Sequence, residues 1–280
     1  MPKVTLFPAP GKKKAASSAL ATTLTQMRAA RRPGLMTHLV AGYPNLRASL
    51  VLARTLIAGG ADLLEVQIPF SDPIADGTLL AAANQRALQN GFQVKDVFWL
   101  VQQLRNTVPI FLMGYCNTIF KSGIPKFCAR AARAGVAGLI FPDLPFDEKE
   151  NSQLQKACQQ FGLVLIPVVS ELTSDQRLSK IAQTAAGFIY CVARLGTTGL
   201  GSQLSRDLQK FLRRVRRFTA LPLAVGFGIA SYQDVRLALS GSAEIAVVGS
   251  ALLKIWDLPK LTEDQKLKRI QGFVKKLKNP

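Results

Sequence analysis

Residues 162–169 read Gly-Leu-Val-Leu-Ile-Pro-Val-Val, an apolar run without the alternation of polar and apolar side chains that marks a half-exposed strand. Such a run is typical of a strand covered on both faces of a parallel sheet. Similar aliphatic or β-branched runs recur along the chain from Leu35 onward. The eight predicted strands span 35–42, 62–69, 108–115, 137–143, 162–169, 187–194, 222–228 and 244–249.

Segments with the apolar spacing of amphipathic helices lie between these strands. They span 46–58, 96–105, 124–134, 148–161, 174–185 and 204–218. Eight strand-helix units in about 240 residues predict an α/β protein of one domain, a (β/α)8 TIM barrel of the usual size. A doubly wound sheet is the alternative, although it usually stops at about five or six strands.

The two ends of the chain add to this pattern. Residues 18–31 predict an extra helix before the first strand, and 262–277 predict a last helix, so the barrel domain is expected to span 18–280. Residues 1–17 contain three prolines and a run of three lysines, which is the composition of a flexible basic arm. An organelle transit peptide is the alternative interpretation of this arm.

Composition excludes several classes of protein. With 48% hydrophobic residues the chain has enough apolar side chains for a full core, and no apolar run approaches the roughly 20 residues of a membrane span. Cys116, Cys128, Cys158 and Cys191 lack metal-site or disulfide-framework spacing, so a reducing cytoplasm is expected. His38 is the one histidine, which excludes a multi-histidine metal centre, and we expect no metal.

The net charge of +19 suggests nucleic-acid binding until the positions of the charges are considered. Almost all of the excess lies in residues 1–34, 203–220 and 254–280, and the rest of the chain is nearly neutral. These basic stretches lack the aromatic, glycine-loop and finger signatures of RNA-binding modules. We therefore interpret them as solvated basic faces, and nucleic acid is not an expected partner.

Chemistry in such a barrel takes place at the C-terminal ends of the strands. Glu65 lies in the aliphatic run 61–69, where burial disfavours the ionised carboxylate and favours a general acid. A structural role, with Tyr115 as its donor, is the alternative. The following loop contains Asp76, for which reaching over the pocket and forming a turn are both compatible with the sequence.

Other polar side chains end or follow strands, and each has a capping or core role as its alternative. They are Tyr115, Asn117, Asp143, Tyr190 and Arg194. Glycines expose backbone N–H groups at 226–228 and at 249–250, an arrangement with which barrel enzymes often hold phosphate. The glycine-rich loop 195–201 has the composition of a closing lid, or of an ordinary flexible connection.

Some chemistry is excluded. The ends of the first seven predicted strands carry no lysine, which disfavours a Schiff-base aldolase, and a single histidine disfavours a zinc aldolase. The remaining possibility is acid–base catalysis by carboxylates on a phosphorylated small molecule.

These residues resemble the α subunit of tryptophan synthase over nearly all of 18–256. The run Leu-Glu-Val-Gln-Ile-Pro-Phe-Ser-Asp-Pro-Ile-Ala-Asp-Gly at 64–77 is similar to the family signature around two catalytic carboxylates. Five further blocks follow in the order and spacing of the family. They are 115–117, 143–145, Arg194 with 196–199, 226–229 and 249–251.

The resemblance implies a lyase of tryptophan biosynthesis that cleaves indole-3-glycerol phosphate to indole and glyceraldehyde 3-phosphate. It implies that Glu65 protonates C3 of the indole and that Asp76, ionised, accepts the indole N1–H. Residues matching the phosphate site are Gly199, Phe227, Gly228, Gly249 and Ser250. Supporting positions are Tyr115, Tyr190, Thr198 and Arg194.

The resemblance also implies a partner and a cofactor arrangement. Free indole passes to a β subunit in an αββα complex, and pyridoxal phosphate belongs to that β subunit, so no cofactor is expected in this chain.

The chain departs from the family pattern at five positions. Gln67 replaces a usual Gly, Thr78 a usual Pro and Ala81 a common Gln. Ala193 replaces a usual Ser, and His38 a frequently aromatic residue, where it is a candidate contact for the indole.

Three alternatives to an active α subunit remain from the sequence. One is a weakly active chain that mainly activates a β partner, and another is a stand-alone lyase that releases indole. The non-enzyme alternative is an anion- or RNA-binding protein that uses the basic ends, whose binding would fall steeply with salt.

Overall fold

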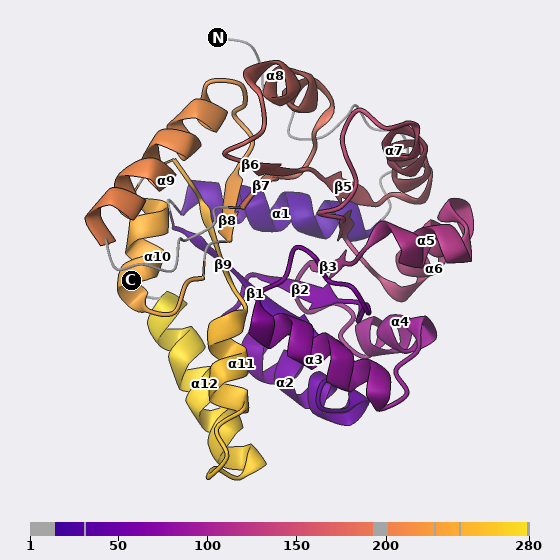
Figure 1. The fold of residues 1–280 in the computed structure, drawn as a ribbon, viewed down its shortest axis with the longest axis vertical. Helices are drawn as coiled ribbons and strands as arrows, with labels where there is room; N and C mark the ends of the chain where they lie inside the picture. Colours follow the sequence, from indigo (N-terminus) through magenta and orange to yellow (C-terminus); the bar gives the residue numbers. More distant parts are fainter. Residues whose placement is uncertain (1–14, 31, 193–200, 227, 241, 279–280) are drawn as a thin grey trace.

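The computed structural model describes residues 15–30, 32–192, 201–226, 228–240 and 242–278. In these residues, nine parallel strands hydrogen-bond in the order β5-β4-β3-β2-β1-β9-β8-β7-β6 and form a nearly closed ring (Figure 1). The strands are β1 (Gly34–Val40), β2 (Leu63–Gln67), β3 (Ile110–Met113), β4 (Gly138–Ile140), β5 (Val164–Ile166), β6 (Val168–Ser170), β7 (Ile189–Val192), β8 (Leu223–Gly226) and β9 (Ile245–Val248).

The strands β5 and β6 occupy the one predicted strand at 162–169, and Pro167 separates them. Proline has no N–H to donate to a strand ladder, so the pairing changes at this residue. On one side β5 pairs with β4, and on the other β6 pairs with β7. The chain itself thus joins the two ends of the strand order, and the predicted eightfold barrel is confirmed.

Helices cover the barrel, most of them on the outside of the ring and one across its opening (Figure 1). They are α1 (Ala15–Ala29), α2 (Leu46–Ala58), α3 (Thr78–Gln89), α4 (Val94–Gln102), α5 (Cys116–Ser122), α6 (Ile124–Ala134), α7 (Lys149–Phe161), α8 (Asp175–Thr184), α9 (Gly201–Arg216), α10 (Tyr232–Leu239), α11 (Ser250–Trp256) and α12 (Glu263–Lys278). Side-chain caps explain several starts: Asn45 accepts from the N–H of Ala48 in α2, and Ser174 accepts from that of Arg177 in α8. The boundary predicted between 17 and 18 falls within α1, which begins at Ala15, and residues 1–14 of the predicted arm lie outside the described residues.

Apolar side chains form two layers, one inside the ring of strands and one outside it. Inside the ring, side chains such as Met36, Leu63 and Phe111 form one cluster with Leu20 and Met27 of α1. A Cβ on Gly34, the first residue of β1, would collide with the Met27 side chain, so α1 packs against the N-terminal ends of the strands. This is the extra helix that the sequence predicted, and it covers the N-terminal opening of the barrel.

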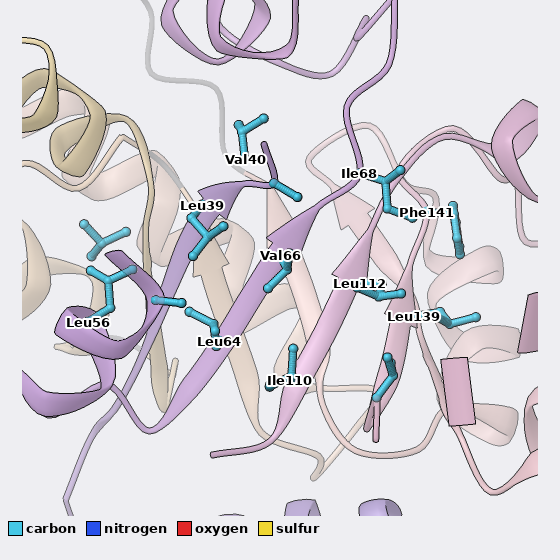
Figure 2. Packing of buried hydrophobic residues seen from close by; sticks show 14 of the residues in the cluster. Leu39, Val40, Leu56, Leu64, Val66, Ile68, Ile110, Leu112, Leu139 and Phe141 are labelled. Carbon is cyan, nitrogen blue, oxygen red and sulfur yellow. The ribbon is translucent and has the colours of Figure 1, made fainter. Parts of the chain in front are cut away.

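The second layer lies between the strands and the outer helices. Figure 2 shows Leu39, Leu64 and Leu112 of neighbouring strands in this layer, with Leu56 of α2 beside them. Because side chains alternate along a strand, Leu64 and Val66 face the helices while Leu63 faces the barrel interior. Glu65 and Gln67 therefore face the interior too.

A cluster of charged side chains lies at the N-terminal face of the barrel. Buried Asp62 accepts from the backbone N–H of Leu35 at 2.9 Å and forms ion pairs with Arg32 at 2.7 Å and with Lys278 of α12. The carboxylate thus ties the start of β1 and the last helix to the start of β2.

We expect Asp62→Ala to lower the free energy of unfolding by about 1–3 kcal/mol, because it leaves a buried N–H without its acceptor and two cations without their partner. Urea denaturation measures the change. The exposed residue Glu171 supplies a matched control, since Glu171→Ala should change stability by no more than about 0.5 kcal/mol. Equal stability of the two variants would contradict a stabilising role for Asp62.

Candidate active site

Two neighbouring strands place a histidine and a carboxylate side by side inside the barrel. His38 of β1 is the register partner of Glu65 of β2, and both lie on the inward face of their strands with Met36 and Leu63. The side chains of His38 and Glu65 are 7% and 2% exposed, so each must find its hydrogen-bond partners inside the protein.

These partners form a continuous bridge. Nδ1 of His38 lies 2.9 Å from Oε2 of Glu65, and its Nε2 lies 3.0 Å from Oε1 of Gln67. Gln67 in turn donates from Nε2 to Oδ2 of Asp76 at 2.5 Å. The two carboxylates that the sequence selected are thus brought together, and two intervening side chains link them.

The loop after β2 holds Asp76 from a second direction. Asn84, a fully buried residue of α3, donates from Nδ2 to Oδ2 of Asp76 at 3.2 Å and to the carbonyl of Leu80 at 2.8 Å. Its Oδ1 accepts from the N–H of Phe70 at 3.1 Å. Sequence analysis did not find Asn84, because a single polar residue in a helix is unremarkable until the loop that it braces is known.

The environment perturbs the acidity of Asp76. Burial raises the pKa of its carboxyl above the usual value, and the Glu65 charge adds to this. The hydrogen bond from Gln67 and the charge of His38 act in the opposite direction and limit the rise in pKa. Together with a hydrogen bond from Tyr115, these two neighbours favour the ionised form of Asp76.

The pKa of His38 is also shifted. Burial by itself lowers the pKa of the imidazole, but the charge and hydrogen bond of Glu65, with smaller contributions from Asp76 and Gln67, raise it above 6.5 overall. His38 thus lies beside Glu65 as a partner that holds its proton more tightly than a free imidazole does.

Two tyrosines support the carboxylates from other strands. The hydroxyl of Tyr115, which follows β3, accepts from the N–H of Ala75 at 3.1 Å and hydrogen-bonds with Asp76, and its ring stacks on Phe70 at a centroid distance of 5.0 Å. Tyr190 of β7 hydrogen-bonds with Glu65, and burial raises the pKa of its phenol. Tyr190 thus lies beside Glu65, which His38 also contacts, and Tyr115 holds the Asp76 loop.

The glycine positions lie against the same groups. A Cβ on Gly226 would be 2.9 Å from Oη of Tyr190, and one on Gly249 would be 3.3 Å from Cβ of His38. Gly228 has a positive φ of 74°, a conformation that favours glycine. Ser250 begins α11 immediately after Gly249. Phe227, Gly199, Thr198 and Arg194 lie outside the described residues.

Asp143 and Asn117 have local surroundings. Both carboxylate oxygens of Asp143 accept from the N–H of Cys116, at 3.1 and 3.0 Å, which fits the capping role that was the alternative for this residue. Asn117 is exposed on α5. The bridge between Glu65 and Asp76 consists of His38 and Gln67 and includes neither residue.

A hollow of about 590 Å³ lies at the other face of the barrel, between α1 and α10. Its lining includes Leu24, Arg28, Arg236 and Leu239. The N-terminal face of such barrels serves stability and the C-terminal face serves chemistry. We therefore place the candidate site at the carboxylates rather than in this hollow.

The position of the carboxylates defines a class of protein. A parallel (β/α)8 barrel with ionisable side chains gathered toward the C-terminal ends of its strands has the arrangement of a barrel enzyme. The chain belongs to the tryptophan synthase alpha chain family, whose model matches residues 24–280.

Individual relatives agree with this assignment. The tryptophan synthase alpha chain of Roseiflexus sp. (strain RS-1) is 42% identical over 264 residues, which cover 93% of this chain and 99% of the relative. That of Methanosarcina acetivorans is 39% identical and covers 82% of this chain and 83% of the relative.

Solved structures are similar over almost the whole chain. The tryptophan synthase subunit alpha of Legionella pneumophila str. Paris superposes with a TM-score of 0.82 at 30% identity and covers 93% of this chain and 97% of its own. A chain of Mycobacterium tuberculosis tryptophan synthase gives the same TM-score and identity and covers 92% and 96%.

These comparisons confirm the resemblance that the sequence motifs indicated. They support a lyase of tryptophan biosynthesis over the alternative of an anion- or RNA-binding protein. In the part of the chain that the structure describes, no helix has both the length and the apolar character for crossing a membrane.

Proposed function

We propose that the chain cleaves indole-3-glycerol phosphate to indole and glyceraldehyde 3-phosphate, with Glu65 and Asp76 as its catalytic residues. One observation carries this proposal: in a member of this family, Glu65 and Asp76 are joined through His38 and Gln67 inside the barrel. The cleavage needs an acid and a base at one end of the substrate and a fixed negative charge at the other.

Glu65 acts on the carbon–carbon bond that breaks. Its protonated carboxyl gives a proton to C3 of the indole ring, which leaves a positive charge on the ring. The resulting carboxylate then takes the proton of the C3′ hydroxyl. The C3–C3′ electron pair returns to the ring, indole leaves, and C3′ becomes the aldehyde carbon. Burial and the hydrogen bond with Tyr190 support this role, because they keep Glu65 in one orientation away from bulk water.

Asp76 acts on the ring nitrogen. As a carboxylate it accepts the indole N1–H and stabilises the positive charge that follows protonation at C3. Gln67 and His38 oppose the effect of burial on the pKa of Asp76 and so favour the ionised form. Tyr115 and Asn84 fix the loop so that the carboxylate does not have to be ordered during the reaction.

The backbone of Gly228, Gly249 and Ser250 is proposed to hold the substrate phosphate, together with Gly199 and Phe227. Backbone N–H groups exposed by glycine suit an anion, and Gly249 lies next to His38, near the carboxylates. Thr198 and Arg194 are proposed to support the loop that closes over the substrate. The chain uses no cofactor of its own in this proposal.

The proposed partner is a tryptophan synthase β subunit that receives the indole in an αββα complex and carries the pyridoxal phosphate. The proposed location of this complex is the cytoplasm. Solved relatives include a chain of Mycobacterium tuberculosis tryptophan synthase, which supports this partner.

The test is indole release from indole-3-glycerol phosphate by the purified chain, with and without a β subunit. We expect activity that rises in the presence of the partner. Equal activity with and without the partner would instead indicate a stand-alone lyase. No indole in the presence of a partner that demonstrably binds would indicate an activator and would contradict the catalytic assignment.

A further inference from the structure

The bridge between the carboxylates contains two side chains to which the proposed reaction gives no step, His38 and Gln67. Both are buried, and each uses both ends of its polar group within the bridge. Their hydrogen-bond roles fix where the protons are.

The assignment of protons begins at Asp76. An ionised carboxylate only accepts hydrogen bonds, so Gln67 must direct its NH2 group toward Oδ2 of Asp76. The reverse orientation of the amide would place two acceptor oxygens 2.5 Å apart. Asn84 donates to the same oxygen, which strengthens this polarity. The carbonyl oxygen of Gln67 therefore faces His38.

The orientation of Gln67 fixes the tautomer of His38. Because Oε1 of Gln67 is an acceptor, Nε2 of His38 must carry a hydrogen. The other ring nitrogen, Nδ1, lies 2.9 Å from Oε2 of Glu65, and one proton lies between them. This proton is either on Glu65, beside a neutral imidazole, or on Nδ1, beside a carboxylate. In both cases Glu65 has direct access to it.

We propose that His38 is a positioning residue which shares one proton with Glu65, and that Gln67 couples this shared proton to the ionised state of Asp76. This inference rests on the proposed lyase function, since it assigns to His38 the supply of the proton that Glu65 gives to the substrate. The general acid is thus the hydrogen-bonded pair rather than Glu65 alone.

The charges around His38 support this sharing. Glu65 of β2 faces its Nδ1, Asp76 of the following loop acts through Gln67, and Tyr190 of β7 hydrogen-bonds with Glu65 from the other side. Gly249, which follows β9, lies next to His38 and brings no charge. Two carboxylates near one imidazole raise the pKa of His38, so the pair keeps its proton to a higher pH than an isolated histidine would.

The first test observes His38 directly, because it is the sole histidine of the chain. Nitrogen-15 NMR of the imidazole should show Nε2 protonated and a titration midpoint above 6.5. Glu65→Gln should lower this midpoint, and Gln67→Met should remove the preference for the Nε2–H tautomer. The exposed Gln85 supplies the control, and Gln85→Met should change neither signal. A midpoint that stays the same in Glu65→Gln would overturn the proposal.

The second test is the pH profile of indole release. In the wild type, His38 and Glu65 share the proton between them. In His38→Gln only Glu65 can hold it. The basic limb of the kcat profile should therefore move to lower pH, with little change in KM. An unchanged basic limb in a folded His38→Gln variant would overturn the proposal.

The two tests separate this proposal from the proposed function. NMR needs no substrate, so it decides the bridge even if the wild-type chain releases no indole, a result that would contradict the lyase function. Should His38→Gln fail to fold, the pH profile cannot be measured on it. Gln67→Met keeps His38 and Glu65 in place and still tests the bridge by NMR.

Discussion

Indole release by a Glu65→Gln variant is expected to fall about 10³- to 10⁴-fold in kcat, the upper range for the loss of a general acid and base. The amide has nearly the volume of the carboxyl, so the buried site and its contacts with His38 and Tyr190 should persist. It has no acidic proton for C3 of the indole and no basic oxygen for the C3′ hydroxyl. The loss should therefore appear in kcat, with KM little changed. Steady-state kinetics in the presence of a β subunit measures it.

The exposed residue Glu148 provides the control for this variant. It precedes α7, away from the barrel interior, and Glu148→Gln should retain wild-type kcat. A Glu65→Gln chain that is folded, binds its partner and still releases indole within about tenfold of the wild type would show that another group performs the acid and base steps.

The sequence predicted the fold well because the signal is repeated. Each buried strand is an apolar run, and several helices between strands have a clear apolar stripe, as in 46–58 and 124–134, which match α2 and α6. The helices α3, α5 and α10 were given no residue ranges from the sequence. They are short or weakly amphipathic, and their first residues follow loops whose geometry depends on the barrel. The sequence did not predict the division of residues 162–169 into β5 and β6 at Pro167, because this division depends on which strands pair on either side.

The candidate site was predicted only in part. Glu65 stood out as a carboxylate in an aliphatic run, and Asp76 came from the motif that follows it. The bridge was not predicted, because His38 and Glu65 are 27 positions apart and meet only through the register of β1 and β2. The sequence did contain a signal. His38 lies two positions after Met36, and Glu65 lies two positions after Leu63, and both apolar residues face the barrel interior.

The second large effect is expected for Asp76→Asn, which should lower kcat about 10²- to 10³-fold, as the loss of one electrostatic group at a transition state usually does. The amide oxygen can still accept from Gln67 and Asn84, so the loop should keep its place. The variant lacks the negative charge that stabilises the protonated indole ring. Asp72→Asn, in the same loop and exposed, is the matched control and should retain activity.

Asp76→Asn should also change stability, in the direction opposite to activity. Since burial raises the pKa of Asp76 above 3.8, the folded state binds its proton more tightly than the unfolded chain does. The stabilisation from that proton is complete below pH 3.8 and is lost as the pH rises through the raised pKa of the folded state. At neutral pH the buried charge therefore destabilises the wild type, and Asp76→Asn should unfold at a higher temperature. This gain should disappear in acid, whereas Asp72→Asn should show no such dependence. If the variant is inactive and also less stable at neutral pH, Asp76 mainly holds the loop together. The idea that its charge serves activity and lowers stability would then be wrong.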